Sequence, residues 1–501
     1  MSGAPENPLA HLRLAVDNPE PADRPRGGGG PGSGDAPPAP DLAEFSEDRL
    51  AAAFTKRHGD ELLYLKARGT WLRDVGTHYR ADETQWVEDR ARQACIEVAD
   101  TAPNKSTAER LASKRTVAAV VALASADRVH ATEVADLDTD PMLLNTPGGI
   151  VDLRTGQLGP HRRAARMTRV AAAAPAGEAP RWRRFLAEVT GGDADVAAYL
   201  QRIAGYCLTG SVVEHALFFV YGPGGNGKSV FIETLAHVLG DYATVAPIDV
   251  FTVSKGERHP TELALLAGAR LVIASETEEG RRWDEAKLKA ITGGDKITAR
   301  FMRQDFFTFE PTFKLLMAGN YRPSIRSVDT AMQRRVNMIP FTQKIAAPDK
   351  GLLQQLRAEA GGILQWMIDG CLAWQRDGLA PPDAVQQATR EYFDTEDVLG
   401  RWLQECCEQD ANAAALTGDL FKSFKGFAVE NGEYAGSERR LSQMLQQRGF
   451  ERWQHPKNRK RGFRGVAVRD AGDTFDFERP NSEASHSGFG KPNEFGDRWP
   501  T

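Results

Sequence analysis

The segment Gly222-Pro-Gly-Gly-Asn-Gly-Lys-Ser229 limits what this chain can fold into more than any other feature, because it fits the pattern G-x-x-x-x-G-K-[ST]. Glycines at these places let backbone N–H groups converge on phosphate oxygens without a Cβ in the way. A buried-strand sequence at residues 216–221 precedes the segment, and a helical sequence at residues 230–239 follows it. Strand, loop and helix therefore occur in the order that a phosphate-binding loop requires.

Each part of this phosphate loop (residues 222–229) has a predicted role. Lys228 is expected to neutralise the β- and γ-phosphates of ATP, and Ser229 offers a hydroxyl to Mg²⁺. The chain is therefore predicted to hydrolyse ATP with Mg²⁺. The residues expected to contact ATP are Gly222, Pro223, Gly224, Gly225, Asn226, Gly227, Lys228 and Ser229.

Polar residues end two later strand-like runs. The run at residues 270–275 ends in Glu276-Thr-Glu278, and a carboxylate at such a place binds Mg²⁺ or polarises the attacking water. Glu276 is the first choice for metal binding, and which of the two glutamates activates water stays open. The run at residues 314–319 ends at Asn320, which is predicted to hold the lytic water or sense the γ-phosphate.

A pair of arginines, Arg334 and Arg335, follows the third strand. An arginine that reaches the γ-phosphate stabilises spreading negative charge, and a neighbouring subunit can supply it. Either arginine is a candidate. The alternation of strands and helices between residues 201 and 343 favours a parallel α/β sheet.

Composition divides the rest of the chain. Residues 1–45 and 471–501 have little apolar content and are predicted to be disordered. Between them we expect an α+β domain (46–200), the ATPase domain (201–345), a helical linker (346–393) and a C-terminal domain of helices and a hairpin (394–470). No secretory signal and no apolar run of about 18 residues occurs, so a cytoplasmic protein without a membrane span is expected.

A formal net charge of −5 means that nucleic-acid contact must come from local basic patches. One candidate patch is a hairpin at residues 296–310, and another is the basic turn of the C-terminal hairpin, which follows a candidate recognition helix at residues 437–448. The residues expected to contact DNA are Lys296, Arg300, Arg303, Lys457, Arg459, Lys460 and Arg461.

The order of these elements resembles superfamily 3 helicases, specifically the helicase part of phage and plasmid primase–helicases related to the poxvirus primase–helicase. The most discriminating piece is Thr292-Gly-Gly-Asp295, and Asn145-Thr-Pro-Gly-Gly resembles a turn of the domain that precedes the ATPase in this family. The resemblance covers about residues 50–470. Ser275 departs from it, because many relatives carry an acid there.

The resemblance implies an AAA+-type P-loop core between an N-terminal primase–helicase-associated α+β domain and a C-terminal winged-helix-like domain. It also implies a homohexameric ring that moves along single-stranded DNA, in which Glu276 is the Walker B acid, Asn320 the sensor, and Arg334 or Arg335 the finger. The implied function is a replicative DNA helicase acting on single-stranded and forked DNA. No primase activity is expected, so a separate primase or initiator is a candidate partner.

Two alternatives remain open. A nucleotide-switched initiator or DNA-binding ATPase without processive unwinding would use the same loop and the same basic turn. A P-loop small-molecule kinase is disfavoured by the arginine pair and by Thr292-Gly-Gly-Asp295.

Overall fold

The computed structural model describes residues 44–253, 261–275, 281–302, 305–325, 328–345 and 347–469. The chain forms two compact units, of which the first ends at Glu396 and the second begins at Asp397. Within the described ranges, no helix is both long enough and apolar enough to cross a membrane.

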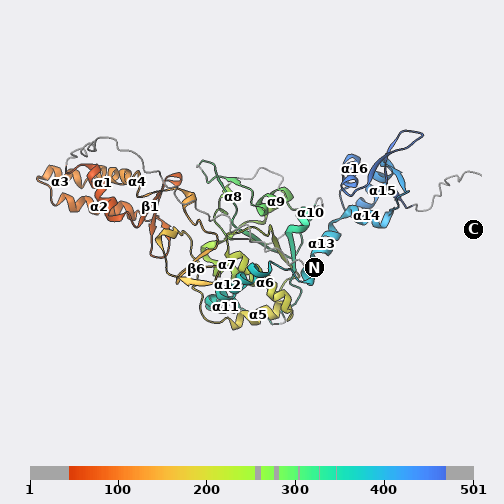
Figure 1. The fold of residues 1–501 in the computed structure, drawn as a ribbon, viewed down its shortest axis with the longest axis horizontal. Coiled ribbons are helices and arrows are strands. Elements are labelled where there is room, and N and C mark those ends of the chain that lie inside the picture. The colour runs from red at the N-terminus through yellow and green to blue at the C-terminus, as the bar shows by residue number, and fades with distance from the viewer. Residues whose placement is uncertain are drawn as a thin grey trace, which may run out of the picture. The chain divides into compact units, whose positions relative to one another are not determined.

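A five-stranded sheet lies at the centre of the first unit (Figure 1). From one edge to the other its strands are β9 (Ala243–Val245), β10 (Leu271–Ser275), β13 (Lys314–Gly319), β8 (Leu217–Tyr221) and β14 (Val336–Pro340). All four pairings are parallel, which confirms the predicted parallel sheet. Strands β8 and β13 are apolar and buried along almost their whole length, because helices cover both faces of the sheet.

Two apolar cores lie on the opposite faces of this sheet. Along β8, Phe218 belongs to one core and its neighbour Phe219 to the other, as the two-residue period of a strand requires. The first core packs against five helices. They are α5 (Pro180–Thr190), α6 (Ala194–Leu208), α7 (Lys228–Leu239), α11 (Leu352–Ala358) and α12 (Ala360–Asp377).

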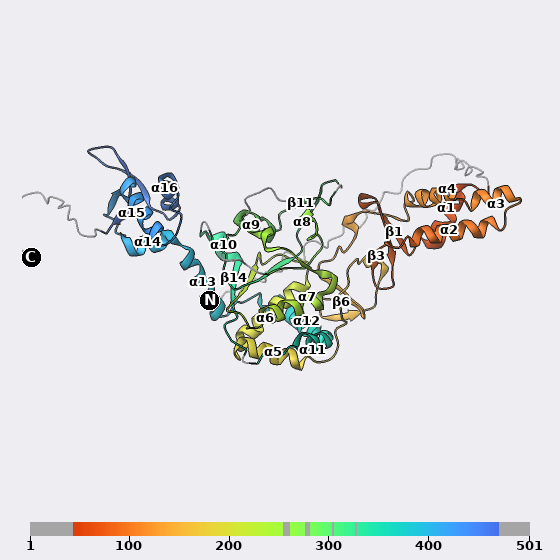
Figure 2. The same cartoon turned by 180° about the vertical axis from the view of Figure 1, so that it is seen from behind.

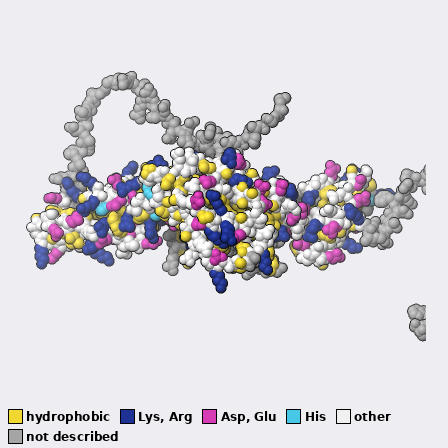
Figure 3. All heavy atoms as spheres, turned by 90° about the horizontal axis from the view of Figure 1, so that it is seen from below, with side chains coloured by type: hydrophobic (Ala, Val, Ile, Leu, Met, Phe, Trp, Pro, Cys, Tyr) yellow, Lys and Arg dark blue, Asp and Glu magenta, His cyan; other side chains and the backbone are white. Residues whose placement is uncertain are grey.

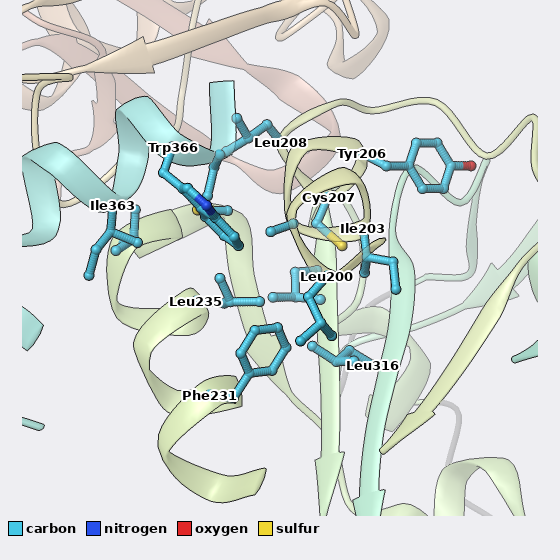
Figure 4. Close-up of a cluster of buried hydrophobic side chains, with 14 of the residues drawn as sticks. Leu200, Ile203, Tyr206, Cys207, Leu208, Phe231, Leu235, Leu316, Ile363 and Trp366 are labelled. Carbon is cyan, nitrogen blue, oxygen red and sulfur yellow. The ribbon is translucent and has the colours of Figure 1, made fainter. Parts of the chain in front are cut away.

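Helices α6 and α12 change two expected domain boundaries. Figure 4 shows side chains of α6 and α7 close to Leu316 of β13, with Ile363 and Trp366 of α12 beside them. The boundary expected between residues 200 and 201 falls inside α6. Residues 346–393, expected as a helical linker, include α12, whose apolar side chains are buried against α6 and α7. Its hydrophobic burial makes α12 part of the first apolar core.

The opposite face carries further helices and a hairpin. The elements are α8 (Thr261–Ala264), α9 (Glu285–Gly293), α10 (Thr330–Arg335), α13 (Asp383–Glu396), β11 (Ile297–Ala299) and β12 (Phe307–Phe309). Strands β11 and β12 pair antiparallel, so the predicted hairpin is confirmed. Figure 2 labels β11 beside α8, in agreement with the contacts between them.

The N-terminal part of the first unit contains two small sheets. The first has the order β3-β2-β1-β4 and packs on four helices, and the second is the antiparallel meander β5-β6-β7. The elements are α1 (Glu47–His58), β1 (Leu62–Leu65), β2 (Thr70–Asp74), β3 (Tyr79–Ala81), α2 (Trp86–Ala99), α3 (Lys105–Leu111), α4 (Lys114–Ser125), β4 (Ala131–Thr132), β5 (Leu143–Thr146), β6 (Gly149–Asp152) and β7 (Gln157–Gly159).

The second unit packs three helices on a three-stranded antiparallel sheet of order β16-β18-β17. Its elements are α14 (Val398–Cys406), β15 (Cys407–Glu408), β16 (Ala414–Leu416), α15 (Thr417–Glu430), α16 (Glu438–Gln447), β17 (Glu451–Gln454), β18 (Arg461–Arg464) and β19 (Ala467–Val468). The short strands β15 and β19 pair separately. The predicted basic turn joins β17 to β18.

Candidate functional site

The phosphate loop connects β8, which lies between β13 and β14 in the five-stranded sheet, to α7. Gly222 has a φ of 153°, and a Cβ there would lie 2.0 Å from the carbonyl oxygen of Phe341, so only glycine fits this close approach. The Asn226 side chain donates to the same carbonyl, which ties the loop to the chain after β14. Pro223, Gly224, Gly225 and Ser229 remain exposed. The loop therefore presents an open surface at the N-terminus of α7.

Lys228 is buried in the loop, and its Nζ is surrounded by oxygens of neutral groups. The acceptors are the carbonyls of Gly222 (2.7 Å) and Pro223 (3.3 Å) and the side chains of Asn226 (3.0 Å) and Asn320 (3.0 Å). No carboxylate of the described residues pairs with this ammonium group, and burial lowers the pKa of Lys228. A cation whose charge is uncompensated at an exposed glycine loop fits a phosphate group.

Asn320 lies directly after β13, which is the neighbour of β8 in the sheet. Its Oδ1 accepts the hydrogen bond from Lys228, so two of the predicted site residues meet although 92 positions separate them. Strand β10 pairs with β13 on its other side and ends at Ser275, level with Ala318. Glu276 and Glu278, which follow β10, lie outside the described residues. Of the two predicted Mg²⁺ ligands, only Ser229 belongs to the described residues. These residues contain no group of three or more His, Cys, Asp or Glu side chains that could hold a metal ion.

The two arginines of α10 differ in their surroundings. Arg335 is half-buried, and its Nε donates to Thr292 Oγ1 over 3.0 Å while its Nη1 donates to the carbonyl of Ala331. Arg334 is exposed, and no side chain of the described residues pairs with it. Arg335 thus ties α10 to the Thr292-Gly-Gly-Asp295 segment, and Arg334 points to solvent.

Arg322 also lies beside the phosphate loop, although the sequence did not predict it as a site residue. Its guanidinium lies 5.0 Å from the ring centre of Tyr221, the residue that immediately precedes the phosphate loop. Arg322 is two residues beyond Asn320, the predicted sensor. A cation this close to a predicted site residue in the sequence could have marked Arg322 as a candidate. The contact brings a second positive charge to the edge of the loop.

Three of the residues expected to contact DNA belong to the segment of the hairpin β11-β12, and their surroundings differ. Lys296 is exposed and lies 3.6 Å from Glu310 across the hairpin. Arg300 stacks on the exposed ring of Phe306 at 4.8 Å. Arg303 lies outside the described residues. The hairpin thus presents basic and aromatic side chains together.

The basic turn of the second unit is well ordered by its own hydrogen bonds. The backbone N of His455 donates to Lys460 O over 2.9 Å, and Lys460 N donates to Asn458 Oδ1 over 3.0 Å. The four predicted contacts are exposed, and the described part of the chain offers them no ion pair. They are Lys457, Arg459, Lys460 and Arg461. Figure 3 shows acidic and basic side chains interspersed over the visible face of the molecule. Attraction to DNA therefore depends on local basic clusters such as this turn.

Comparisons with known proteins match two stretches of the chain. Residues 51–191 match the family described as "D5 N terminal like", and residues 220–335 match a family of unknown function, DUF5906. The solved apo structure of the NrS-1 C terminal region is 10% identical, with a TM-score of 0.45 over 83% of this chain and 98% of that chain.

Several curated viral proteins are similar in sequence. A "Putative helicase" of Acanthamoeba polyphaga mimivirus is 28% identical over 228 residues, which are 41% of this chain and 24% of that protein. A "Putative helicase" of Frog virus 3 is 23% identical over 275 residues, 50% of this chain and 28% of that protein. A "Putative primase" of African swine fever virus is 26% identical over 162 residues, 31% of this chain and 17% of that protein.

The chain spans about a quarter of the length of the first two of these relatives, at 24% and 28%. The match to the D5 N terminal-like family ends shortly before the phosphate loop, and the second family match begins on β8 and includes the loop, Asn320 and Arg334. These two matches, together with the viral relatives, relate the chain to the D5-like primase–helicases.

Proposed function

We propose that this chain is the ATP-hydrolysing subunit of a superfamily 3 DNA helicase. The observation that carries the proposal is the hydrogen bond between Lys228 and Asn320 at the mouth of an exposed glycine loop. A phosphate-binding cation and a strand-end amide within one hydrogen bond of each other suit a site that both binds a triphosphate and responds to its hydrolysis.

The residues divide the chemistry between them. Lys228, held by neutral oxygens, exchanges these contacts for the phosphates of ATP, which frees Asn320 to orient the attacking water. Mg²⁺, held by Ser229 and Glu276, would supply charge neutralisation between the phosphates.

The proposed assembly is a homohexameric ring in which each site is completed by a neighbour. Arg334 is exposed and lacks a partner among the described side chains, so it suits a role in trans. Arg335 is already engaged with Thr292, so it suits a structural role that positions Arg334. This division supports Arg334 as the finger.

Two surfaces are proposed to contact DNA. The hairpin with Arg300 and Phe306 suits single-stranded DNA, because bases stack on exposed aromatic rings and phosphates pair with guanidinium groups. The second unit has the element order of a winged helix, with α16 as the recognition helix and the turn at residues 455–460 as the wing. Forked DNA offers both kinds of strand, and a separate primase or initiator is the proposed partner.

Strand displacement on forked DNA with ATP, measured together with the oligomeric mass, tests this function. We expect unwinding by a ring-sized assembly, and loss of unwinding and ATP hydrolysis in Lys228→Ala. The exposed basic turn also suits the alternative, a nucleotide-switched initiator. DNA-stimulated ATP hydrolysis without strand displacement would favour the initiator. Hydrolysis by Lys228→Ala at the wild-type rate would refute both.

A further inference from the structure

A groove of about 1740 Å³ lies in the first unit, apart from the phosphate loop. Its walls are strands β1–β3 of the N-terminal sheet, the segments around Thr168 and Gly240, and the hairpin residues Phe301 and 305–312. The volume exceeds the 300–1,000 Å³ that is typical of sites for small ligands. A groove of this size suits a segment of a polymer.

Four arginines line this groove, and each lacks a carboxylate partner among the described residues. They are Arg68, Arg80, Arg169 and Arg270. Arg270 is buried and donates to the carbonyls of Leu143 and Leu208 over 2.6 and 2.5 Å. Arg68 and Arg80 are exposed and make no side-chain hydrogen bond within the described ranges. Asp138 and Asp140 act on the charge of Arg270 without contacting it, whereas Arg68 and Arg80 keep their guanidinium groups free of ion pairs among the described residues.

Arg169 is held in place from behind. Its Nη2 donates to the carbonyl of Ala267 over 2.7 Å, and Nη1 donates to that of Asp241. Gly268 has a φ of 75°, and a Cβ there would lie 3.0 Å from Nη2 of Arg169, so the glycine leaves room for the guanidinium. Although Arg68 is exposed on the surface, neighbouring atoms partly desolvate its guanidinium group, and this desolvation followed by the charge of Arg169 lowers the pKa of Arg68. Two guanidinium groups close enough to repel each other favour an anion between them.

Aromatic rings line the hairpin side of the groove. Phe301 and Phe307 stack at 5.5 Å with an interplanar angle of 16°. Phe306 is 60% exposed and carries Arg300 on its face. A base could stack on such a ring, because every base has a flat face and none needs to be read by hydrogen bonds.

Four acidic residues line the groove beside these cations. They are Asp138, Asp241, Asp305 and Glu310. Asp138 accepts hydrogen bonds from Thr168, including one from its backbone N at 2.9 Å, and Glu310 lies 3.6 Å from Lys296. Asp241 Oδ2 accepts from the backbone N of Val170 over 3.2 Å, so three of the four acids are engaged by other groups, while Arg68 and Arg80 remain available.

We propose that this groove binds single-stranded DNA and leads the strand from the hairpin on to Arg68 and Arg80 of the N-terminal sheet. Unpaired cations on one wall and stacked rings on the other match the two halves of a nucleotide, its phosphate and its base. Duplex DNA keeps its bases stacked on one another and could not use the rings. The proposal rests on the proposed function and adds a second DNA-contact surface to the same subunit.

The test measures binding of a fluorescent oligothymidylate to the whole chain, without nucleotide, across a range of salt concentrations. Arg68→Ala combined with Arg80→Ala should raise Kd about tenfold. It should also reduce the magnitude of the salt slope by about 1.4, at about 0.7 for each phosphate that an arginine no longer neutralises. The matched control is Arg115→Ala with Arg128→Ala, two exposed arginines of the same unit that do not line the groove. This pair should leave both values unchanged.

A second readout does not depend on affinity. Ala67 is exposed and lines the groove, so the thiol of Ala67→Cys should react with a maleimide and be protected by the oligothymidylate. Unchanged salt slopes together with an unprotected thiol would overturn the inference, and if the wild-type chain still unwinds forked DNA, the proposed function survives. Protection that depends on protein concentration without DNA would identify the groove as a subunit contact and also overturn the inference. A wild-type chain that binds no single-stranded DNA would refute both proposals.

Discussion

The Nζ of Lys228 donates a 3.0 Å hydrogen bond to Oδ1 of Asn320, which joins the start of α7 to the end of β13. The contact exists because β13 lies directly beside β8 in the sheet, so their carboxyl ends lie at one edge. Asn320 is exposed and otherwise free to turn, whereas Lys228 is buried. A change at Asn320 should therefore alter the site without altering the core.

Substituting Asn320 should separate binding of ATP from its hydrolysis. We expect Asn320→Ala to keep the affinity for ATP and to lower kcat about 100-fold, because the reacting end of the site then lacks one positioned polar group. Asn320→Asp should instead weaken ATP binding, since a carboxylate beside Lys228 competes with the phosphates. Steady-state ATP hydrolysis and nucleotide binding, with melting temperatures as a check on folding, distinguish the two variants. Equal effects of both on kcat and on affinity would contradict the proposed role.

The arginines of α10 should fail in different ways. Arg334→Ala should keep the wild-type melting temperature and lower kcat about 1,000-fold or more, as expected for a finger. Arg335→Ala removes the hydrogen bond to Thr292, which costs about 1 kcal/mol and should lower the melting temperature by a few degrees.

Mixed assemblies check whether Arg334 acts across a subunit interface. Lys228→Ala subunits keep Arg334, and Arg334→Ala subunits keep an intact loop, so mixing two inactive proteins should restore part of the ATP hydrolysis. The control is a chain that carries both Arg334→Ala and Lys228→Ala, and assemblies of this double variant should stay inactive. An Arg335→Ala protein that is inactive alone and regains hydrolysis when mixed with Lys228→Ala subunits would reverse the assignment.

Local patterns in the sequence were enough to predict the phosphate loop, the parallel sheet and the hairpin at residues 296–310. Each depends on neighbouring residues, such as the glycines around Asn226 or the β-prone runs on either side of Met302. The structure confirms the sheet and the hairpin. The roles of the individual site residues stay predictions.

Tertiary packing decided what the sequence left open. Arg334 and Arg335 are chemically identical neighbours, but successive residues of a helix point about 100° apart, and only Arg335 faces Thr292. Helix α12 lies in the expected helical linker, yet its apolar side chains pack against α6 and α7 in the first core. Neither fact depends on residues that are close in sequence.

The basic turn of the second unit should contribute to DNA affinity without regard to base sequence. Replacing Lys457, Arg459 and Lys460 by alanine should weaken binding of duplex DNA uniformly. It should also reduce the magnitude of the salt slope by about 1 for each phosphate that the turn no longer neutralises. Electrophoretic mobility or anisotropy at several salt concentrations measures this. Replacing Lys422 and Lys425 of α15 is the control; it removes two positive charges instead of three, so an equal weakening per charge removed would assign the effect to charge alone.

Lys314 is a buried cation at the opposite end of β13 from Asn320. Its Nζ donates to the carbonyl of Thr209, which follows the last turn of α6, and to that of Ser211 over 3.3 Å, and it lies 4.8 Å from the ring centre of Tyr206. These partners are neutral, although the C-terminal end of a helix favours a cation. Burial lowers the pKa of Lys314 to about 7.

This low pKa should make the stability of the first unit depend on pH. An unfolded lysine titrates near pH 10.4, so between about pH 7 and pH 10 the unfolded chain holds one more proton at this site than the folded chain. The contribution of Lys314 should therefore become more favourable as the pH rises, by up to about 1.4 kcal/mol per unit. We expect Lys314→Met to gain stability relative to wild type as the pH falls from 9 to 7, in thermal or urea unfolding. The exposed control Lys114→Met should track the wild type, and a constant difference between wild type and Lys314→Met would show that Lys314 stays charged throughout.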